Sequence, residues 1–483
     1  MKLRPPSIPL FPLDPYFSLW APGDTLTGQP VAHWTGKPCQ LVGEAVLDGQ
    51  RFRFLGESDA PAMTQQSLSA DALSTTAVME AAGVRLTLFF LTPLLPDDYD
   101  LLTRPVGLLE VKAQSLDGAA HSVQVSLRAS EELCLDHRGQ MPVEVTQDPA
   151  VLKMGSKDQP VLSRSGDDLR IDWGWVCLSA KGEQVRLSTC QDAMTWICAE
   201  ADASAAPVLF ALGYDDRESI QYFGKNLRSW WNRDGKTIET AMAEALDGFE
   251  TVRQRCDDFS TRLFARAVRA GGEHYAELLE LAWRQVLAAH KLVLDENGEI
   301  LYISKECFSN GCAATVDVSY PSMPLFLLFA PELVRGMMRP IFRYAADPIW
   351  PFDFAPHDAG QYPLLNGQVY SGGTDPKSQM PVEECGNMLL MMTAVTVADG
   401  KLDFAREHLP VLKQWAGYLL THGADPGEQL CTDDFAGHLA HNCNLSLKAI
   451  MGLAGLGRLC RMLGEEAEGN RYDKAAREMA AHW

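Results

Sequence analysis

Apolar and polar residues alternate along much of the chain between about residues 40 and 210. The alternation is clear in Val84, Leu86, Leu88 and Phe90, and again in Val123, Val125 and Leu127. A period of two is typical of strands that bury one face. Further strands are predicted at residues 41–47, 106–114, 169–179 and 184–190, with Gly, Asp, Pro or Ser between them. Many short strands separated by turn residues predict a β-sandwich.

The spacing of apolar residues changes near Thr237, where they begin to recur every three or four positions. This spacing predicts a connecting helix over residues 236–271. After Gly272 the chain is predicted to be mostly helical. The expected helices span residues 275–290, 323–345, 380–398, 402–422, 444–463 and 465–483. A β-rich first part is therefore followed by an α-rich second part.

Length and charge limit the possible partners. A chain of 483 residues is long enough for about three domains of roughly 150 residues. Its formal net charge is -21, so nucleic acid and anionic membrane surfaces are poor partners. No apolar run approaches the length that a membrane-spanning helix needs. The start of the chain has no apolar core of a signal peptide, which predicts a cytoplasmic location.

The cysteines give no sign of a metal or redox motif. There are twelve, and none forms a CxxC pair, so neither a zinc knuckle nor a thioredoxin-type site is predicted. Without an export signal, reduced and mostly buried thiols are expected.

A long segment from residue 347 to 378 interrupts the helical pattern with several prolines. Within WPFDFAPHDAGQYP it carries Trp350, Asp353, His357, Asp358 and Tyr362. Loops this long inside a compact domain are usually functional, and these side chains suit a polar ring or an amide substrate. The alternative is a structural loop in which Asp side chains cap turns and aromatic rings fill the core.

Two acidic residues, Glu383 and Glu384, precede a strongly apolar run, and Asn387 follows three positions later. Positions three apart share one face of a helix, so Glu384 and Asn387 could point together into a cavity. As an alternative, the two acids simply lie in the first turn, near the positive end of the helix dipole.

A third polar cluster, TDDFAGHLAHNCN, contains Asp433, Asp434, His438, His441 and Asn442. If Thr432 or Asp433 caps a helix, Asp434, His438 and His441 line one side of it. Such a stripe binds a metal or forms a hydrogen-bonded network. Because the spacing lacks the HExxH form, no metal is predicted. No cofactor is predicted either, since Walker and Rossmann motifs are absent. A calcium ion, if present, would find its oxygen ligands in the Asp-rich loops.

Glu384 and Asp434 are the predicted catalytic pair, since each carboxylate introduces a different helix. Two such groups are what glycoside hydrolysis needs. GxSxG, SxxK, Walker and Rossmann motifs are absent from the sequence. Gly452, Gly455 and Gly457 lie in a helical pattern without a preceding strand, so they indicate tight helix packing.

Several long motifs are familiar when taken together: RPPSIPLFPLDPYFSLWAPGDTLT, HWTGKP, VRLTLFFLTPLLPDD, SNGCAATVDVSYPSMPLF, PFDFAPHDAGQYP, MPVEECGNMLLMM and TDDFAGHLAHNCNLSLKAI. In this order they resemble the glutaminase A family of fungi and bacteria. The resemblance implies an N-terminal segment (1–60), a β-sandwich (61–235), a linker helix (236–271) and an (α/α)6 toroid of the six-hairpin glycosidase type (272–483). Family members usually extend further and are often exported, so the toroid is expected to be truncated here.

The family name implies hydrolysis of L-glutamine to L-glutamate and ammonia. Either Glu384 or Asp434 would activate water and the other would protonate the departing ammonia, while Asn387 or His357 steadies the oxyanion. The first alternative is a glycoside hydrolase that uses the same carboxylates, with Trp350 and Tyr362 stacked on the sugar. The second is an inactive fragment or scaffold.

The oligomeric state stays open. The substrate is expected to be a small molecule that contacts a wider set of polar and aromatic residues. These residues are Trp350, Asp353, His357, Asp358, Tyr362, Glu383, Asn387, Asp433, His438, His441, Asn442 and Asp317.

Overall fold

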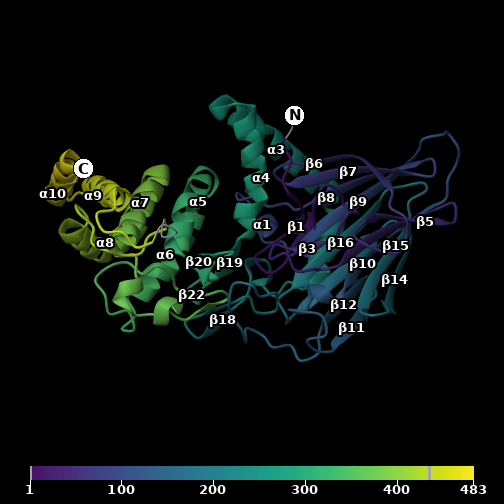
Figure 1. The fold of residues 1–483 in the computed structure, drawn as a ribbon, viewed down its shortest axis with the longest axis horizontal. Helices are drawn as coiled ribbons and strands as arrows, with labels where there is room; N and C mark the ends of the chain where they lie inside the picture. Colours follow the sequence, from purple (N-terminus) through teal and green to yellow (C-terminus); the bar gives the residue numbers. More distant parts are fainter. Residues whose placement is uncertain (1–2, 433–436) are drawn as a thin grey trace. The chain divides into compact units, whose positions relative to one another are not determined.

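The computed structural model describes residues 3–432 and 437–483 (Figure 1). Contacts along the chain divide it into two compact units. The first, here called the sheet unit, contains residues 1–163, 168–218 and 230–289. The second, the helical unit, contains residues 164–167, 219–229 and 290–483. The domain boundaries expected from the sequence stay predictions.

The sheet unit is built around two antiparallel sheets. The larger has the strand order β11-β12-β13-β16-β9-β8-β7-β6 and the smaller the order β14-β15-β10-β4-β5. The larger sheet comprises β6 (Thr64–Ala70), β7 (Ser74–Ala81), β8 (Val84–Leu91), β9 (Val106–Ser115), β11 (Val143–Asp148), β12 (Val151–Ser156), β13 (Trp175–Lys181) and β16 (Val208–Asp215). The smaller comprises β4 (Leu41–Leu47), β5 (Gln50–Leu55), β10 (Val123–Ser130), β14 (Glu183–Gln191) and β15 (Thr195–Asp202). A small third sheet joins β1 (Ser7–Pro12), β2 (Ser18–Pro22) and β3 (Ala32–His33).

Apolar side chains at alternate positions of the strands form the core of the sheet unit. Leu86, Leu88 and Phe90 of β8 are fully buried, as are the alternate residues Val125 and Leu127 of β10. The two sheets contact each other through β13 and β15. The predicted β-sandwich is therefore confirmed, and nearly every predicted strand is present.

One predicted strand is too long, because residues 169–174 are not extended into the sheet and β13 begins only at Trp175. The backbone N–H of Arg170 instead donates to Asp136 Oδ1 at 3.0 Å. Gly174 then turns the chain with a φ of 80°. These local bonds prevent the apolar run from pairing along its full length.

The helices of the sheet unit are α1 (Tyr99–Leu102), α2 (Ile238–Asp247), α3 (Phe249–Gly271) and α4 (Glu273–Ala288). The single connecting helix predicted over 236–271 is thus two helices that meet at Gly248. A groove of about 720 Å³ separates α3 from the face of β7, β8 and β9. Arg253 of α3 lines this groove, with its guanidinium 4.2 Å from the ring centre of Phe89.

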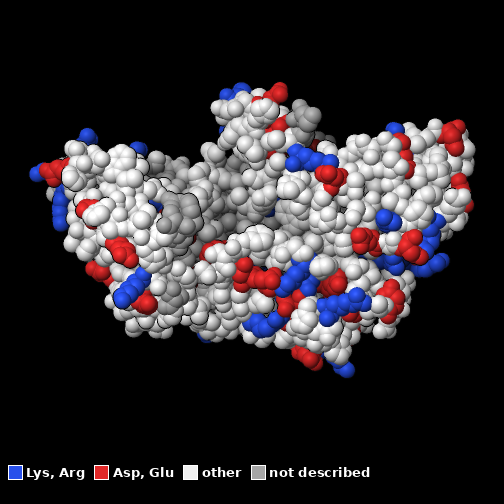
Figure 2. Space-filling model, viewed as in Figure 1, with Lys and Arg blue, Asp and Glu red and all other residues white. Residues whose placement is uncertain are grey.

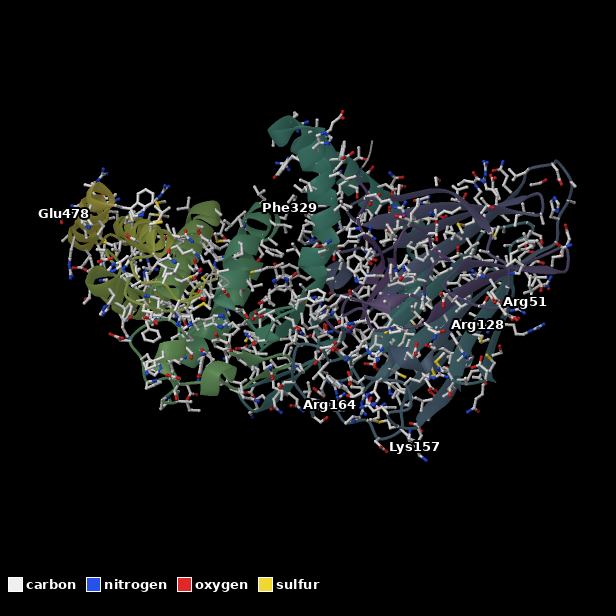
Figure 3. The ribbon with its side chains drawn as sticks, in the orientation of Figure 1. Arg51, Arg128, Lys157, Arg164, Phe329 and Glu478 are labelled. Carbon is white, nitrogen blue, oxygen red and sulfur yellow. The ribbon has the colours of Figure 1, made fainter. Side chains whose placement is uncertain are left out.

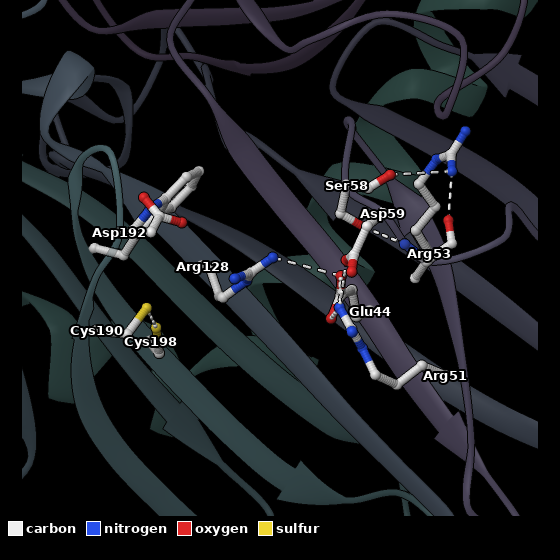
Figure 4. Close-up of polar contacts among 11 residues, drawn as sticks. Glu44, Arg51, Arg53, Ser58, Asp59, Arg128, Cys190, Asp192 and Cys198 are labelled. Carbon is white, nitrogen blue, oxygen red and sulfur yellow. Dashed lines mark hydrogen bonds and ion pairs between the residues drawn. The ribbon is translucent and has the colours of Figure 1, made fainter.

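The smaller sheet carries a charged network on one face. Figure 4 shows Glu44 between Arg51 and Arg128, whose Nη2 atoms lie 3.0 and 3.4 Å from Glu44 Oε1. Figure 3 places the two arginines in the same sandwich. On the molecular face drawn in Figure 2, basic side chains likewise lie beside acidic ones.

The helical unit contains α5 (Val316–Phe329), α6 (Pro331–Ala345), α7 (Pro381–Asp399), α8 (Asp403–His422), α9 (Cys443–Met462) and α10 (Glu466–His482). Its strands are β17 (Ile220–Tyr222), β18 (Lys225–Leu227), β19 (His290–Leu294), β20 (Ile300–Ser304), β21 (Cys312–Ala313), β22 (Gly360–Gln361) and β23 (Leu364–Leu365). None of the helices in the described part of the chain is long and apolar enough to cross a membrane.

Two expectations for the helical unit need correction. The helix predicted over 323–345 is two helices, α5 and α6, because Pro331 begins a new helix after the extended residue Ala330. The hairpin of β19 and β20 was not predicted at all. The remaining helices match their predicted ranges closely.

Helices α7 and α9 pack with almost no space between their backbones. A Cβ atom on Gly452 would lie 3.1 Å from the Cα atom of Gly386, and one on Gly386 would lie 2.9 Å from the carbonyl oxygen of Lys448. A Cβ atom on Gly455 would lie 3.0 Å from Thr393 Oγ1. The prediction that these glycines serve tight helix packing is confirmed.

Candidate functional site

Three segments of the helical unit bring titratable side chains together. Asp317 lies in the first turn of α5, and Glu383 and Glu384 lie in the first turn of α7. The loop between α6 and α7 supplies His357 and Asp358. The sequence folds this way locally because Pro381 begins α7 at its first position, where a missing N–H costs nothing.

His357 and Asp358 form a buried pair. His357 Nδ1 lies 2.8 Å from Asp358 Oδ2, and Asp358 Oδ1 accepts a hydrogen bond from the backbone N–H of Gly360 at 2.9 Å. On the other side of the ring, His357 Nε2 is 3.6 Å from Asp317 Oδ1. Burial alone would lower the pKa of His357, but the hydrogen bond and charge of Asp358 and the nearby carboxylates raise it to about 10. The ring is therefore an imidazolium at neutral pH.

Glu384 and Asn387 face each other within the first turns of α7, as the sequence predicts. Asn387 Nδ2 donates to Glu384 Oε2 at 3.0 Å, and both residues are fully buried. Glu384 Oε1 and Asn387 Oδ1 have no hydrogen-bond partner among the described residues. Burial, followed by the charges of Asp317 and Glu383, raises the pKa of Glu384 well above its ordinary value. Its carboxyl group can therefore carry a proton at neutral pH.

Glu383 anchors the segment that ends at Thr432. It accepts the Thr432 backbone N–H at 2.8 Å and contacts the Lys448 ammonium. The Thr432 hydroxyl lies 2.6 Å from Glu383 Oε1 and 3.1 Å from Asp317 Oδ2. Because that hydroxyl has one proton, it donates to one carboxylate at a time. Both carboxylate oxygens of Glu383 are thus occupied, which makes it a positioning group.

Asp317 is the second carboxylate of the cluster. Burial raises the pKa of Asp317, while the charge of His357 lowers it. Its Oδ1 atom has no hydrogen-bond partner in the described part of the chain. A carboxylate with a free oxygen beside an imidazolium can accept a proton from a substrate or a water molecule.

Cys312 is also near this histidine but is poorly suited to act as a nucleophile. Its thiol is buried beside Asp358 and Glu306, and burial together with those carboxylates raises the pKa of Cys312. A thiol held neutral in this way is inert.

Two overlapping groups have donor atoms close enough to share a metal ion. In one, atoms of Asp317, His357 and Glu384 all lie within 4.8 Å of one another, and in the other the same holds for Cys312, His357 and Asp358. The sequence analysis proposed neither group.

The aromatic residues that are predicted to bind substrate in this loop are buried. Trp350 is 5% exposed, packs on Tyr344 and donates to the carbonyl of Phe354 at 2.9 Å. Tyr362 is 1% exposed, whereas Asp353 is exposed. Their assignment as substrate-binding residues stays a prediction.

The predicted helical stripe near residue 438 is not formed. Residues 437–442 are not helical, since Gly437 has a φ of 90° and His441 a φ of 61°. His438 is exposed, and His441 Nδ1 lies 2.7 Å from Asp425 Oδ1. Asn442 caps α9 by accepting the N–H groups of its first turn.

The remaining members of that predicted stripe, Asp433 and Asp434, lie outside the described residues. The catalytic pair of Glu384 and Asp434 therefore stays a prediction. Of the predicted site residues, the structure brings together Asp317, His357, Asp358, Glu383, Glu384 and Asn387. Sequence reasoning missed Lys448 and Cys312.

Comparison with known proteins addresses the whole chain. A family model described as the glutaminase A six helical-hairpin domain matches residues 272–483. Two domains of unknown function match residues 1–65 and, in two segments, 73–203 and 193–265. Glutaminase A of Aspergillus oryzae is 28% identical over 528 residues, which cover 99% of this chain and 76% of that protein. These matches support the glutaminase A family as the family that this chain resembles.

Other relatives extend this comparison. A protein of Arthroderma benhamiae named "Probable glutaminase" is 28% identical over 264 residues, covering 43% of this chain and 30% of its own. The solved structure of a bacterial glucoamylase complexed with acarbose aligns with a TM-score of 0.48 and 11% identity, and this chain spans 65% of it. The family-model and relative matches confirm the resemblance to the glutaminase A family, and the matched helical-hairpin domain agrees with the predicted β-then-α fold class.

Proposed function

We propose that this chain hydrolyses the side-chain amide of L-glutamine to L-glutamate and ammonia at the cluster of Asp317, His357 and Glu384. The observation that carries the chemistry is the meeting of a buried carboxyl group, a half-buried carboxyl group and a buried imidazole, all with donor atoms within 4.8 Å. The choice of substrate is supported by the names of the curated relatives.

In the proposed reaction Asp317 accepts a proton from a water molecule as the water attacks the amide carbon. The imidazolium of His357, fixed by Asp358, donates to the oxygen that becomes negative. Glu384 then gives its proton to the departing nitrogen, so that ammonia leaves as the C–N bond breaks. Asn387 holds the Glu384 carboxyl group in place.

Asp317 takes the role that the sequence analysis gave to Asp434. Within the described residues, Asp317 is the carboxylate that approaches both His357 and Glu384. Glu383, by contrast, is occupied by Thr432 and Lys448.

A second candidate is glycoside hydrolysis at the same cluster. Donor atoms of Asp317 and Glu384 within 4.8 Å are closer to the roughly 5–5.5 Å of retaining enzymes than to the wider spacing of inverting ones. The half-buried ring of Tyr370 lies 5.4 Å from the ring of His357 and offers a face to a sugar.

The test is ammonia release from L-glutamine by the wild-type chain, by Glu384→Gln and by Glu407→Gln. Glu407 lies on the exposed side of α8 and is the matched control. Loss of a proton-transfer group is expected to lower kcat by about 10²–10⁴-fold in Glu384→Gln only. Circular dichroism checks that all three are folded.

A folded wild type that releases no ammonia would contradict the glutaminase assignment. Release of sugar from a panel of aryl glycosides by that same protein, lost in Glu384→Gln, would then support the second candidate. Activity on neither substrate class would support the inactive fragment or scaffold considered from the sequence.

A further inference from the structure

His357 presents one ring nitrogen to two carboxyl groups at an unusual distance. The 3.6 Å between His357 Nε2 and Asp317 Oδ1 is too long for a hydrogen bond. It is close to the separation of two ligands on one metal ion, since ligands about 2.1 Å from an ion at a tetrahedral angle lie roughly 3.4 Å apart. Glu384 completes the group, with donor atoms of all three residues within 4.8 Å.

Several buried oxygen atoms around this point lack donors. Asp317 Oδ1, Glu384 Oε1 and Asn387 Oδ1 have no hydrogen-bond partner in the described part of the chain. Glu384 and Asn387 are fully buried. Buried acceptors are normally satisfied, so unpartnered oxygens of this kind indicate a missing cation or donor.

The other ring nitrogen is already held in the way that metal-binding histidines are held. Nδ1 is paired with Asp358, which is itself fixed by the backbone N–H of Gly360. A carboxylate behind a histidine orients the ring and strengthens it as a ligand. The alternative group with Cys312 includes Asp358 itself, so an ion there would disturb this pair.

We propose that Asp317, His357 and Glu384 form a binding site for a divalent cation of the zinc class. One imidazole nitrogen and two carboxylate oxygens suit Zn²⁺, which on binding would displace the protons that His357 and Glu384 carry. Three protein ligands leave a fourth position open for water. The proposal shares its residues with the proposed function. A bound ion would occupy the carboxylate oxygens that the reaction needs, so Zn²⁺ inhibits hydrolysis.

The test is titration of the chelator-stripped full chain with Zn²⁺, in competition with a chromogenic chelator and without substrate. The wild type is expected to bind one ion per chain. His357→Gln and Glu384→Gln are expected to lose this binding, and Asp358→Asn to weaken it by about 10–100-fold. Far-ultraviolet circular dichroism on each variant excludes unfolding, and Asp358→Asn serves if His357→Gln does not fold.

His121→Gln is the matched control. His121 also lies between two carboxylates, but both its nitrogens are used, Nδ1 at 2.6 Å from Asp48 and Nε2 at 3.0 Å from Asp117. Its substitution should leave Zn²⁺ binding unchanged. Binding that survives in folded Glu384→Gln, or that disappears in His121→Gln, would overturn the proposal, as would a wild type that binds no ion.

The ion site and the proposed function can fail separately. Zn²⁺ binding by a wild type that never releases ammonia would leave the ion site standing and remove the glutaminase assignment. Ammonia release by a wild type that binds no Zn²⁺ would do the reverse.

Discussion

The ion pair between Lys448 and Glu383 offers a quantitative test of the site's architecture. Only 1% of the Glu383 side chain and 16% of the Lys448 side chain are exposed. Replacing Lys448 by Met would leave a buried carboxylate without its cation, a change that typically costs about 3–5 kcal/mol. An ion pair at 4 Å and an effective dielectric constant near 20 gives about 4 kcal/mol.

The lower end of this range is expected for Lys448→Met, because Thr432 keeps its two hydrogen bonds to Glu383. We therefore expect the free energy of unfolding to fall by about 3 kcal/mol. Adding Glu383→Gln to this variant should restore part of the loss, since the amide needs no counter-ion.

The assay is urea unfolding followed by circular dichroism at 222 nm, on the wild type, both single variants and the double variant. A cycle in which the two single effects add within about 0.5 kcal/mol would show that the residues do not interact. That result would refute the reading of Glu383 as a positioning group neutralised by Lys448.

Three further predictions concern stability. Arg284 is fully buried and donates to three backbone carbonyls and a hydroxyl. Arg284→Met should therefore lower the free energy of unfolding by about 3–5 kcal/mol. Urea titration measures this loss, and an unchanged unfolding midpoint would contradict it. Hydrogen bonds to Asp48 and Asp117 raise the pKa of His121. The contribution of these bonds to the free energy of unfolding is therefore complete below pH 6.5 and is lost as the pH rises through the raised pKa. A backbone N–H and His121 lower the pKa of Asp117 from 3.8 to about 2, so this contribution fades as the pH falls from about 4. His121→Gln should therefore lower the free energy of unfolding most between about pH 4 and the raised pKa of His121. An equal loss at every pH, measured by urea titration, would contradict this prediction. Gly452→Ala should cost about 1–3 kcal/mol through overpacking against α7, whereas Gly417→Ala, whose Cβ meets no atom within 4 Å, should not lower the melting temperature.

The fold was largely predictable because its elements follow simple periods. Alternation identified β8 and β10, and the spacing of apolar residues identified α7 to α10. The break between α5 and α6 was missed because the apolar pattern continues across it, although Pro331 marked the boundary. The hairpin of β19 and β20 was also readable, since alternating residues flank an Asp-Glu-Asn-Gly turn.

The site was predictable only where its members are close in sequence. His357 with Asp358, and Glu384 with Asn387, were recognised as local groups, and both pairs are formed. Asp317 was expected to contact substrate, but no spacing rule joins it to Glu384. Lys448 lies in the second turn of α9 and reaches Glu383 only because α9 packs on α7. Such contacts depend on tertiary structure.

The near contact of Gly386 and Gly452 restricts how α9 can move against α7. Helices that touch through their backbones have no deformable layer of side chains there, so a tilt of α9 against α7 would pivot near that point. Lys448 is four residues from the pivot and Met462 ten, which at 1.5 Å per residue are about 6 and 15 Å. A tilt of about 10° would move Met462 by roughly 2.6 Å but Lys448 by only about 1 Å. Movements at the far end of α9 are thus damped before they reach the charged groups at its start.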